Sequence, residues 1–318
     1  METWTFQNSC VRGHAGGKIM AENEQKKTHV IMVGNQKGGV AKTTNTINLA
    51  GALVERGKKV LVIDLDATSG ATKALGAPVT GWHSSYDLLT GGAPPGDCII
   101  QSDDQEVKLP PGIDLIPASK QLVDLEEWLR RRENKWVIHQ DILLKPIKEL
   151  RGIYDFIFLD TPPQITTTTL PAMKASDFVI LSTMPETAST DQLADALQDV
   201  RACTEGPNPH LKLLGIIISA MPRPMTVLAR QLNEYVAKNC VDSKGRSHRF
   251  NTAISRTTTI QEARAVRTTV LVYQGDSRVA DEYRELAKEV LARIETITSE
   301  TVEAPLFENL DSASEAEA

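Results

Sequence analysis

The sequence predicts one α/β domain in which a doubly wound, mostly parallel sheet carries helices on both faces. Apolar runs recur along the chain, and segments with helical spacing follow most of them at intervals of about 25 to 40 residues. The runs are apolar at successive positions, as expected for strands that are buried on both faces. With 318 residues, of which 41% are apolar, the chain can fill the core of such a domain.

The first predicted strand, residues 29–33, leads into a glycine-containing loop, residues 34–44, and then into a helix near 46–54. This order predicts a phosphate-binding loop, because glycines let backbone N–H groups turn toward an anion and a helix N-terminus adds positive potential. Lys42 would contact the β and γ phosphates, and Thr43 would offer a hydroxyl to Mg²⁺.

This loop departs from the usual phosphate-loop motif. The pattern G-x-x-x-x-G-K-[ST] requires glycine where the chain has Ala41. The variant pattern K-G-G-x-x-K-[ST]-[ST] matches without a gap, and it places a second lysine, Lys37, at the entrance of the loop.

The second predicted strand, residues 60–63, ends in two aspartates, Asp64 and Asp66. Acids at the carboxyl end of a parallel strand lie where α/β folds bind ligands, so we expect Asp66 to face the phosphate site. Asp64 is expected to hold the shape of the following loop or to help position a metal ion. The alternative is an aspartate that only caps the next helix. Small polar residues at 67–72 suit a loop that changes shape with the nucleotide.

The middle of the chain holds a Pro/Gly-rich insertion at 77–112 and a third acidic strand end. The sequence predicts a short helix at 85–89, a strand at 113–117, helices near 120–133 and 137–150, and a strand at 154–160. That last strand closes on Asp160, which would hold Mg²⁺, through water, opposite the loop. Three consecutive arginines at 130–132 are more consistent with a solvated face than with nucleic-acid contact.

The rest of the folded part continues the same alternation. Strands are predicted at 178–182 and 213–218, and helices near 188–204, 225–240 and 281–297. The four cysteines, Cys10, Cys98, Cys203 and Cys240, are far apart and are expected to be buried or inert thiols.

The two ends differ from the body in composition. Residues 1–28 are polar and without period, which indicates a flexible arm, and Met20 is an alternative start. Residues 298–318 carry six acids and no Lys or Arg, which indicates a disordered acidic tail and leaves a body with 35 acids and 35 bases. The folded domain is therefore predicted at 29–297. No apolar run is long enough to span a membrane.

One segment, residues 223–267, is strongly basic. It contains nine bases against three acids, a surplus that suits sequence-independent contact with the phosphates of duplex DNA. Scattered surface charge is the alternative reading.

These motifs resemble the ParA-type partition ATPases, which belong to the deviant Walker A group of P-loop NTPases. The resemblance covers residues 29–297, and it rests on the loop, on the strand ends at Asp64-Leu65-Asp66 and Asp160-Thr161-Pro162-Pro163, and on the late run from Asp276 to Val290. It implies that two subunits clamp two ATP molecules face to face, with Lys37 reaching the partner's phosphates. The residues implied to bind ATP are Lys37, Gly38, Gly39, Val40, Ala41, Lys42, Thr43 and Thr44.

The resemblance also implies catalytic roles and partners. Lys37, Lys42 and Asp66 would be catalytic, with Asp66 positioning the attacking water, and Thr43, Asp160 and Asp64 would form the Mg²⁺ side. The ATP-bound homodimer would bind double-stranded DNA without sequence preference, in the cytoplasm on the nucleoid and not on a membrane. A ParB-like centromere-binding partner would stimulate slow hydrolysis.

The sequence departs from this family at two places. Ala67-Thr68-Ser69-Gly70 replaces the usual Pro-Gln-Gly-Asn, and only Arg256 keeps a family arginine for DNA. Two other family arginines fall near Thr259 and Met225, so Arg223 and Arg230 are the candidates to replace them.

Two alternative functions stay open. One is a ParA-like ATPase that positions a protein cargo, such as a chemoreceptor array or a carboxysome. The other is a metabolic ATP-dependent ligase of the same fold.

Overall fold

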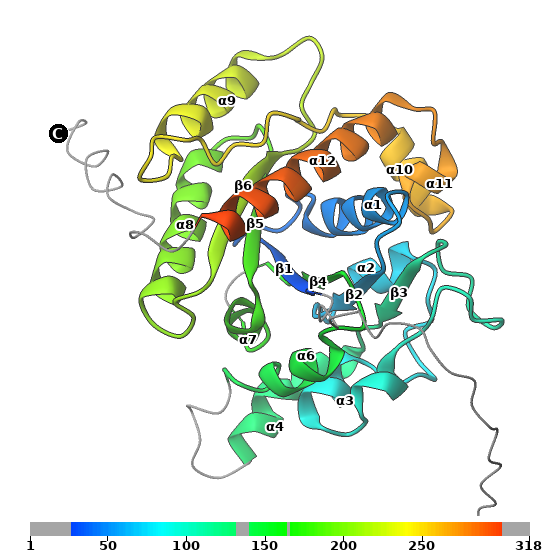
Figure 1. Ribbon diagram of the computed structural model, residues 1–318. Coiled ribbons are helices and arrows are strands. Elements are labelled where there is room, and N and C mark those ends of the chain that lie inside the picture. Colours follow the sequence, from blue (N-terminus) through cyan, green and yellow to red (C-terminus); the bar gives the residue numbers. More distant parts are fainter. Residues whose placement is uncertain (1–26, 132–139, 164–165, 301–318) are drawn as a thin grey trace, which may run out of the picture.

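A computed structural model describes residues 27–131, 140–163 and 166–300 (Figure 1). The predicted arm therefore lies almost wholly outside the described residues, as do all but three residues of the predicted tail. Cys10 and Arg132 lie outside them as well.

The core of the fold is a six-stranded sheet in the order β3-β2-β4-β1-β5-β6. All five strand pairs are parallel, so the predicted doubly wound sheet is confirmed. β1 lies near the centre, and the chain builds the sheet first on one side of it and then on the other. The strands are β1 (His29–Gly34), β2 (Val60–Asp64), β3 (Ile113–Ile116), β4 (Phe156–Asp160), β5 (Phe178–Thr183) and β6 (Lys212–Ile218).

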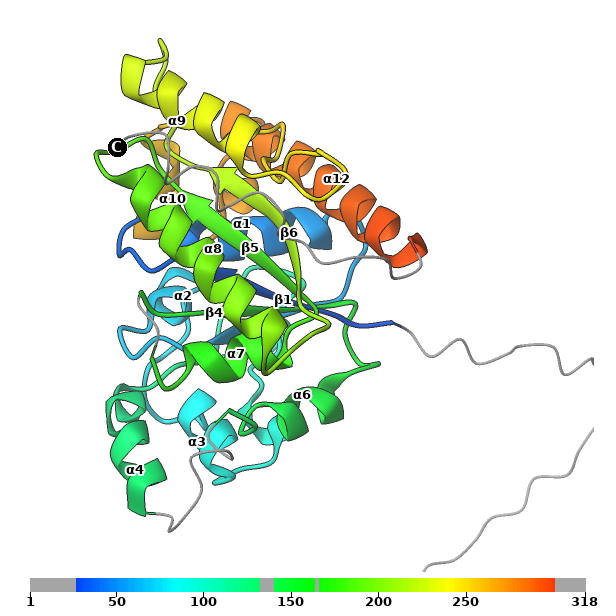
Figure 2. The same cartoon turned by 90° about the vertical axis from the view of Figure 1, so that its left-hand side faces the viewer.

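Helices cover both faces of this sheet, because alternate strand residues point to opposite sides (Figures 1 and 2). One face packs against α1 (Lys42–Val54), α2 (Gly70–Ala74), α10 (Thr259–Ala265), α11 (Val270–Tyr273) and α12 (Arg278–Ser299). The other packs against α3 (Ser85–Thr90), α4 (Leu125–Arg131), α6 (Leu144–Leu150), α7 (Thr169–Ala175), α8 (Ser189–Glu205) and α9 (Val227–Asn239).

Several predicted boundaries were wrong. Residues 67–72 are not all loop, because α2 begins at Gly70. The helix predicted at 120–133 is a 3-10 turn, Lys120–Asp124, followed by α4, and in the described residues the helix predicted at 137–150 begins only at Leu144. The 3-10 turn Pro95–Cys98 and the helices α7, α10 and α11 were not predicted. These elements are seven residues long or shorter, too short for their periodicity to stand out from loop sequence.

The long last helix, α12, packs on α1 beside the phosphate loop. Its buried side begins with Val279 and Ala280, runs through Tyr283 and Leu286, and ends at Ile294. The helix continues to Ser299, two residues beyond its predicted end. No helix in the described residues is long and apolar enough to cross a membrane.

The described cysteines match the expectation of buried thiols. Cys98, Cys203 and Cys240 are all buried and free. Burial raises the pKa of the Cys203 thiol to about 11 and that of the Cys240 thiol to about 12.

Candidate functional site

The phosphate loop connects β1 to α1 through a left-handed turn. Gly39 has a φ of 82° and Ala41 a φ of 67°. The left-handed conformation costs alanine more than glycine, yet Ala41 adopts it in the slot where the usual motif has glycine. The hydroxyl of Ser182 donates to the carbonyl oxygen of Val40, and the Asn35 amide donates to the Ser182 carbonyl over 2.6 Å, so β5 fixes the loop.

Lys42 lies at the start of α1 and is almost fully buried, with 7% of its surface exposed. Its Nζ donates to the carbonyl oxygen of Lys37 across the loop, over 3.0 Å. Burial lowers the pKa of Lys42, and the nearby carboxylates of Asp160 and Asp66 oppose that shift. The site therefore contains a desolvated cation, which interacts more strongly with an anion than a solvated one does.

Two buried carboxyl groups, those of Asp64 and Asp160, lie next to each other where β2 and β4 pair. Asp160 accepts hydrogen bonds from the hydroxyls of Thr43, at 2.7 Å, and Thr46, at 3.4 Å. Burial raises the pKa of both aspartates, and for Asp160 the repulsion from Asp64 adds to the shift. A cation beside Asp160 would relieve this destabilisation.

The two aspartates differ in what surrounds them. Asp64 accepts from the backbone N–H of Asp66 at 3.1 Å, and from the N–H and hydroxyl of Thr72 at 2.8 and 2.7 Å. It thereby orders the 64–72 loop, and its predicted part in holding a metal stays a prediction. Asp160 faces Thr43, the other residue predicted on the Mg²⁺ side.

A cavity of about 620 Å³ extends from the phosphate loop toward the segment 254–264. Asp66, Thr68 and Gly70 line one side of it, close to Lys42 and Thr43. The lining also includes Met184, Pro185, Ser219, Ala220, Ile254, Ile260 and Tyr283. The cavity is large enough for a nucleotide, and it brings the predicted loop and Asp66 together.

A buried polar network fixes one wall of this cavity. The amide of Asn45, on α1, donates to the hydroxyls of Ser182 and Ser219, both at 2.8 Å. The Tyr283 hydroxyl on α12 donates to the Asn45 side-chain oxygen over 2.9 Å. The carboxyl ends of β5 and β6 and the last helix are thus held to the helix that follows the loop.

Lys37, the second lysine of the loop, forms an ion pair with Glu186, with 2.6 Å between Nζ and Oε2. The side chains are 28% and 49% exposed. Nothing in the sequence indicated Glu186, which is 149 residues from Lys37 along the chain. The pair is accessible to solvent, so it contributes little stability and can be exchanged for another partner.

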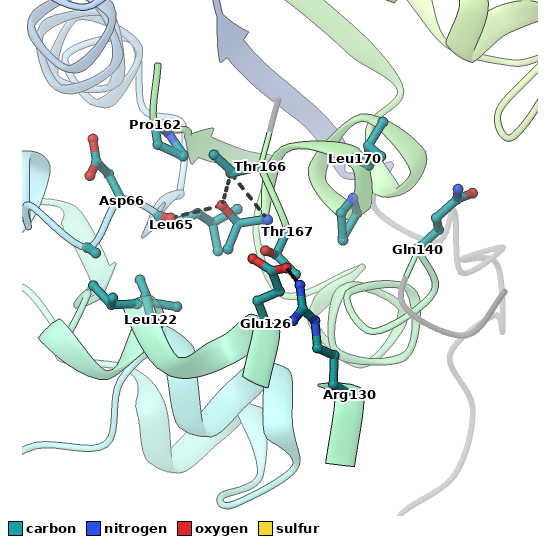
Figure 3. Close-up of a pocket in the computed structure, with 14 residues that line it drawn as sticks. Leu65, Asp66, Leu122, Glu126, Arg130, Gln140, Pro162, Thr166, Thr167 and Leu170 are labelled. Atoms are coloured by element: carbon teal, nitrogen blue, oxygen red, sulfur yellow. Dashed lines mark hydrogen bonds and ion pairs between the residues drawn. The ribbon is translucent and has the colours of Figure 1, made fainter. Parts of the chain in front are cut away.

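A second cavity, of about 560 Å³, lies on the other side of Asp66 (Figure 3). It is lined mainly by apolar and threonine side chains, including Leu65, Leu122 and Thr166. On its wall Arg130 pairs with Glu126, and Arg131 pairs with Glu127 one position further along α4. These exposed pairs agree with the prediction of a solvated face for Arg130 and Arg131, the two described residues of the run.

The structure separates the three arginines proposed for DNA. Arg223 is ion-paired with Glu282 at 3.3 Å and donates to the Ser255 hydroxyl at 3.0 Å. Arg230 and Arg256 are exposed, and they form no ion pair with the described residues. Arg256 also lines the cavity beside the phosphate loop, together with Arg264, another base of the segment 223–267.

Comparison with known proteins identifies relatives of this site and fold. The AAA_31 family model, an AAA domain, matches residues 28–213. The chain is 33% identical over 270 residues to the chromosome-partitioning ATPase Soj of Thermus thermophilus, and the match covers 85% of this chain and 98% of Soj. It is 30% identical over 265 residues to the chromosome partitioning protein ParA of Caulobacter vibrioides, covering 83% of this chain and 94% of that protein.

The solved structures that are similar to this chain include a cobyrinic acid a,c-diamide synthase from Mycobacterium smegmatis with bound ADP and magnesium. It matches with a TM-score of 0.68 and 27% identity, and the match covers 88% of this chain and 99% of that one.

Proposed function

The chain belongs to the ParA/Soj family of partition ATPases, and from this premise we propose that it is the ATP-driven component of a DNA segregation system. As a member of this family the protein is an ATPase, and ATP and Mg²⁺ are its cofactors. The observation that carries the proposal is the phosphate loop, which combines the buried Lys42 with a second, accessible lysine, Lys37.

The residues at the end of β1 fit a nucleotide and its metal. The loop residues 38–44 would offer backbone N–H groups around the buried Lys42, and the Thr43 hydroxyl lies beside the Asp160 carboxylate. Mg²⁺ neutralises charge on the phosphates when bound. We assign Thr43 and Asp160 to its side of the site, with Asp64 as the residue that keeps the adjoining loop in place.

Asp66 is the residue that we propose to orient the attacking water. Its carboxylate accepts the N–H of Thr68 at 2.8 Å and lies at the boundary of the two cavities, partly accessible to solvent. A carboxylate in this place can accept a proton or hold a water molecule, whereas the buried Asp64 is already occupied by three donors. Undiminished turnover in an Asp66→Ala protein would contradict this role.

Lys37 supports an ATP-dependent homodimer. A monomeric phosphate site already has Lys42, so a second lysine at the rim of the loop is explained if it reaches the phosphates bound by a partner subunit. We propose that Lys37 exchanges Glu186 for those phosphates when two subunits meet. The exposed ion pair would oppose this exchange only weakly.

The basic segment supports non-specific binding of double-stranded DNA by that dimer, on the nucleoid in the cytoplasm. Arg230 and Arg256 are the exposed arginines of the predicted set that have no ion-pair partner in the described residues. Arg223 would first have to leave Glu282. A ParB-like partner would stimulate hydrolysis and release the DNA.

A single pair of variants tests the dimer and its consequences. Light scattering with ATP and Mg²⁺ should show a dimer for the natural protein and a monomer for Lys37→Ala, which should also lose duplex binding. The matched control is Glu186→Gln, which should dimerise at least as readily because the competing ion pair is gone. A Lys37→Ala protein that dimerises on ATP and hydrolyses it normally would overturn the assignment of Lys37.

The ligase alternative has one observation in its favour, the similarity to the structure described as a cobyrinic acid a,c-diamide synthase. The identity to the partition ATPases is higher, over nearly their full length. Turnover that rises with duplex DNA and a ParB-like partner supports partition. Turnover that requires a carboxylic acid and an amide donor would support the ligase.

A further inference from the structure

The C-terminal segment leaves the described structure attached to the basic segment. Glu300, the last described residue, forms two hydrogen bonds with the Arg246 guanidinium, at 2.8 and 3.1 Å, and an ion pair with Lys244 at 3.1 Å. Arg246 also pairs with Asp242 at 2.7 Å. The first acid after α12 is therefore bound by bases of the segment that we propose for DNA.

Helices α9 and α12 run in the same direction (Figures 1 and 2), and residues 249–255 lie between them, bonded to Asn233 of α9 and to Glu282 and Glu289 of α12. At their N-terminal ends Arg223, before α9, pairs with Glu282 of α12. At their C-terminal ends Arg246, after α9, pairs with Glu300. With a rise of 1.5 Å per residue, α12 places Glu300 about 27 Å from Glu282.

The start of α9 has an unusual surface, which we call the α9 patch: Met225, Val227, Leu228 and Arg230. The three apolar side chains are 44%, 70% and 39% exposed. Arg230, one turn along, is exposed and has no ion-pair partner in the described residues. Grouped apolar side chains beside an unpaired cation are typical of a surface that is covered by a ligand.

The sequence that follows Glu300 is complementary to the α9 patch. Residues 301–318 lie outside the described residues, and their sequence groups three apolar residues, Leu306, Phe307 and Leu310, with acids on either side and no base. An extended chain advances about 3.3–3.6 Å per residue, so about eight residues span the 27 Å back to the start of α9. This places the group near residues 306–310 at the α9 patch.

We propose that residues 301–318 dock on the α9 patch of the same chain and compete there with DNA. Leu306, Phe307 and Leu310 would cover the exposed apolar side chains, and the acids beside them would pair with Arg230 and with Lys238, the other base of α9. The competition with DNA rests on the proposed function of this surface, whereas the docking does not.

Weak docking is sufficient for this effect. A short tether holds the segment at an effective concentration of the order of millimolar, so a segment with a dissociation constant near 0.1 mM would lower the apparent DNA affinity about tenfold. DNA at high local concentration would displace it. The segment would thus favour release from DNA once an ATP-bound dimer separates.

Hydrogen exchange of the full chain tests the docking without DNA. Residues 305–311 and the first turn of α9 should exchange more slowly in the natural protein than in a full-length variant with Leu306→Ser, Phe307→Ser and Leu310→Ser. The matched control replaces Ala304, Ala313 and Ala316 by serine, which keeps the length and all six acids, and it should behave like the natural protein. A Val227→Ser/Leu228→Ser protein should lose protection at 305–311.

The outcomes separate the two parts of the proposal. Equal exchange in the natural and apolar-to-serine proteins would overturn the docking, and so would protection that increases with protein concentration, because the segment would then bind a second copy. With docking present, the apolar-to-serine variant should bind duplex about tenfold more tightly. Docking without any change in duplex affinity would show that the proposed DNA surface is wrong while the docking stands.

Discussion

The phosphate site and the basic segment both depend on charged side chains, but these side chains are mostly buried in the first region and mostly exposed in the second. At the phosphate site Lys42, Asp64 and Asp160 are buried in fixed positions at strand ends and at the start of α1. In the basic segment most of the charges are exposed, and several pair with acids from α12 or from its end. The position of a buried charge fixes which group it can act on. An exposed charge can bind a ligand readily only if the tertiary structure leaves it without an ion-pair partner.

Removing Lys42 should produce the largest effect, because a desolvated cation acts on phosphate charge with little screening. We expect Lys42→Ala to lower kcat for ATP hydrolysis by about 10²–10³-fold. Steady-state phosphate release measures this. The control is Lys120→Ala, an exposed lysine at the start of a 3-10 turn, which should keep full activity. Equal loss in both proteins would mean that the effect does not come from the site.

The stability of the fold should be sensitive to the packing between β6 and the basic segment. Gly215, on β6, leaves room for Phe250 and Arg293, because a Cβ there would lie 2.5 Å from the Phe250 ring and 2.7 Å from the guanidinium. We expect Gly215→Ala to lower the free energy of unfolding by about 1–3 kcal/mol. Denaturant unfolding measures this. Gly57→Ala is a contrasting control, because its left-handed backbone is strained by alanine but nothing surrounds the new Cβ. Stability equal to that of the natural protein would show that β6 can shift there.

The buried carboxyl pair should destabilise the protein when no cation is bound. The folded-state pKa of Asp160 is raised, so without nucleotide and Mg²⁺ stability should fall as pH rises from about 4 toward 8, while the unfolded state has already lost its proton. Asp160→Asn should gain about 1–2 kcal/mol near pH 8 and flatten this dependence. Thermal unfolding in EDTA at several pH values measures it. The same variant should lose Mg²⁺-dependent turnover. An unchanged pH profile would contradict the strain that we assign to the pair.

The smallest effect that we expect is a difference in duplex binding between variants of an arginine without an ion-pair partner and of an arginine with one. Arg230→Ala should weaken duplex binding severalfold and reduce its dependence on salt by about one released ion. Arg246→Ala, a matched change in an arginine held by Asp242 and Glu300, should have less direct effect on phosphate contact. Binding titrations in the ATP state at several salt concentrations measure both. Equal losses would mean that pairing in the monomer does not predict availability.

Much of the phosphate site could be predicted from sequence because its parts are local. Lys42 and Thr43 are placed by a loop that is continuous in the chain, and Asp66 and Asp160 each follow an apolar run that is recognisable as a strand. Parallel strands bring their carboxyl ends to one edge, so these residues had to converge. The arrangement of Asp64 and Asp160 in register was not predictable, because strand order decides which strand ends are neighbours.

The sequence by itself determined the strands, the phosphate loop and the acids at two of the strand ends, since each depends on neighbouring residues and on the burial of an apolar run. Only the tertiary structure decided the partners of the exposed charges: Glu186 for Lys37, Glu282 for Arg223, and Glu300 for Arg246. These partners are 54 to 149 residues apart in the chain. Packing of α8, α9 and α12 on the sheet brings them together, and no local pattern of residues encodes that proximity.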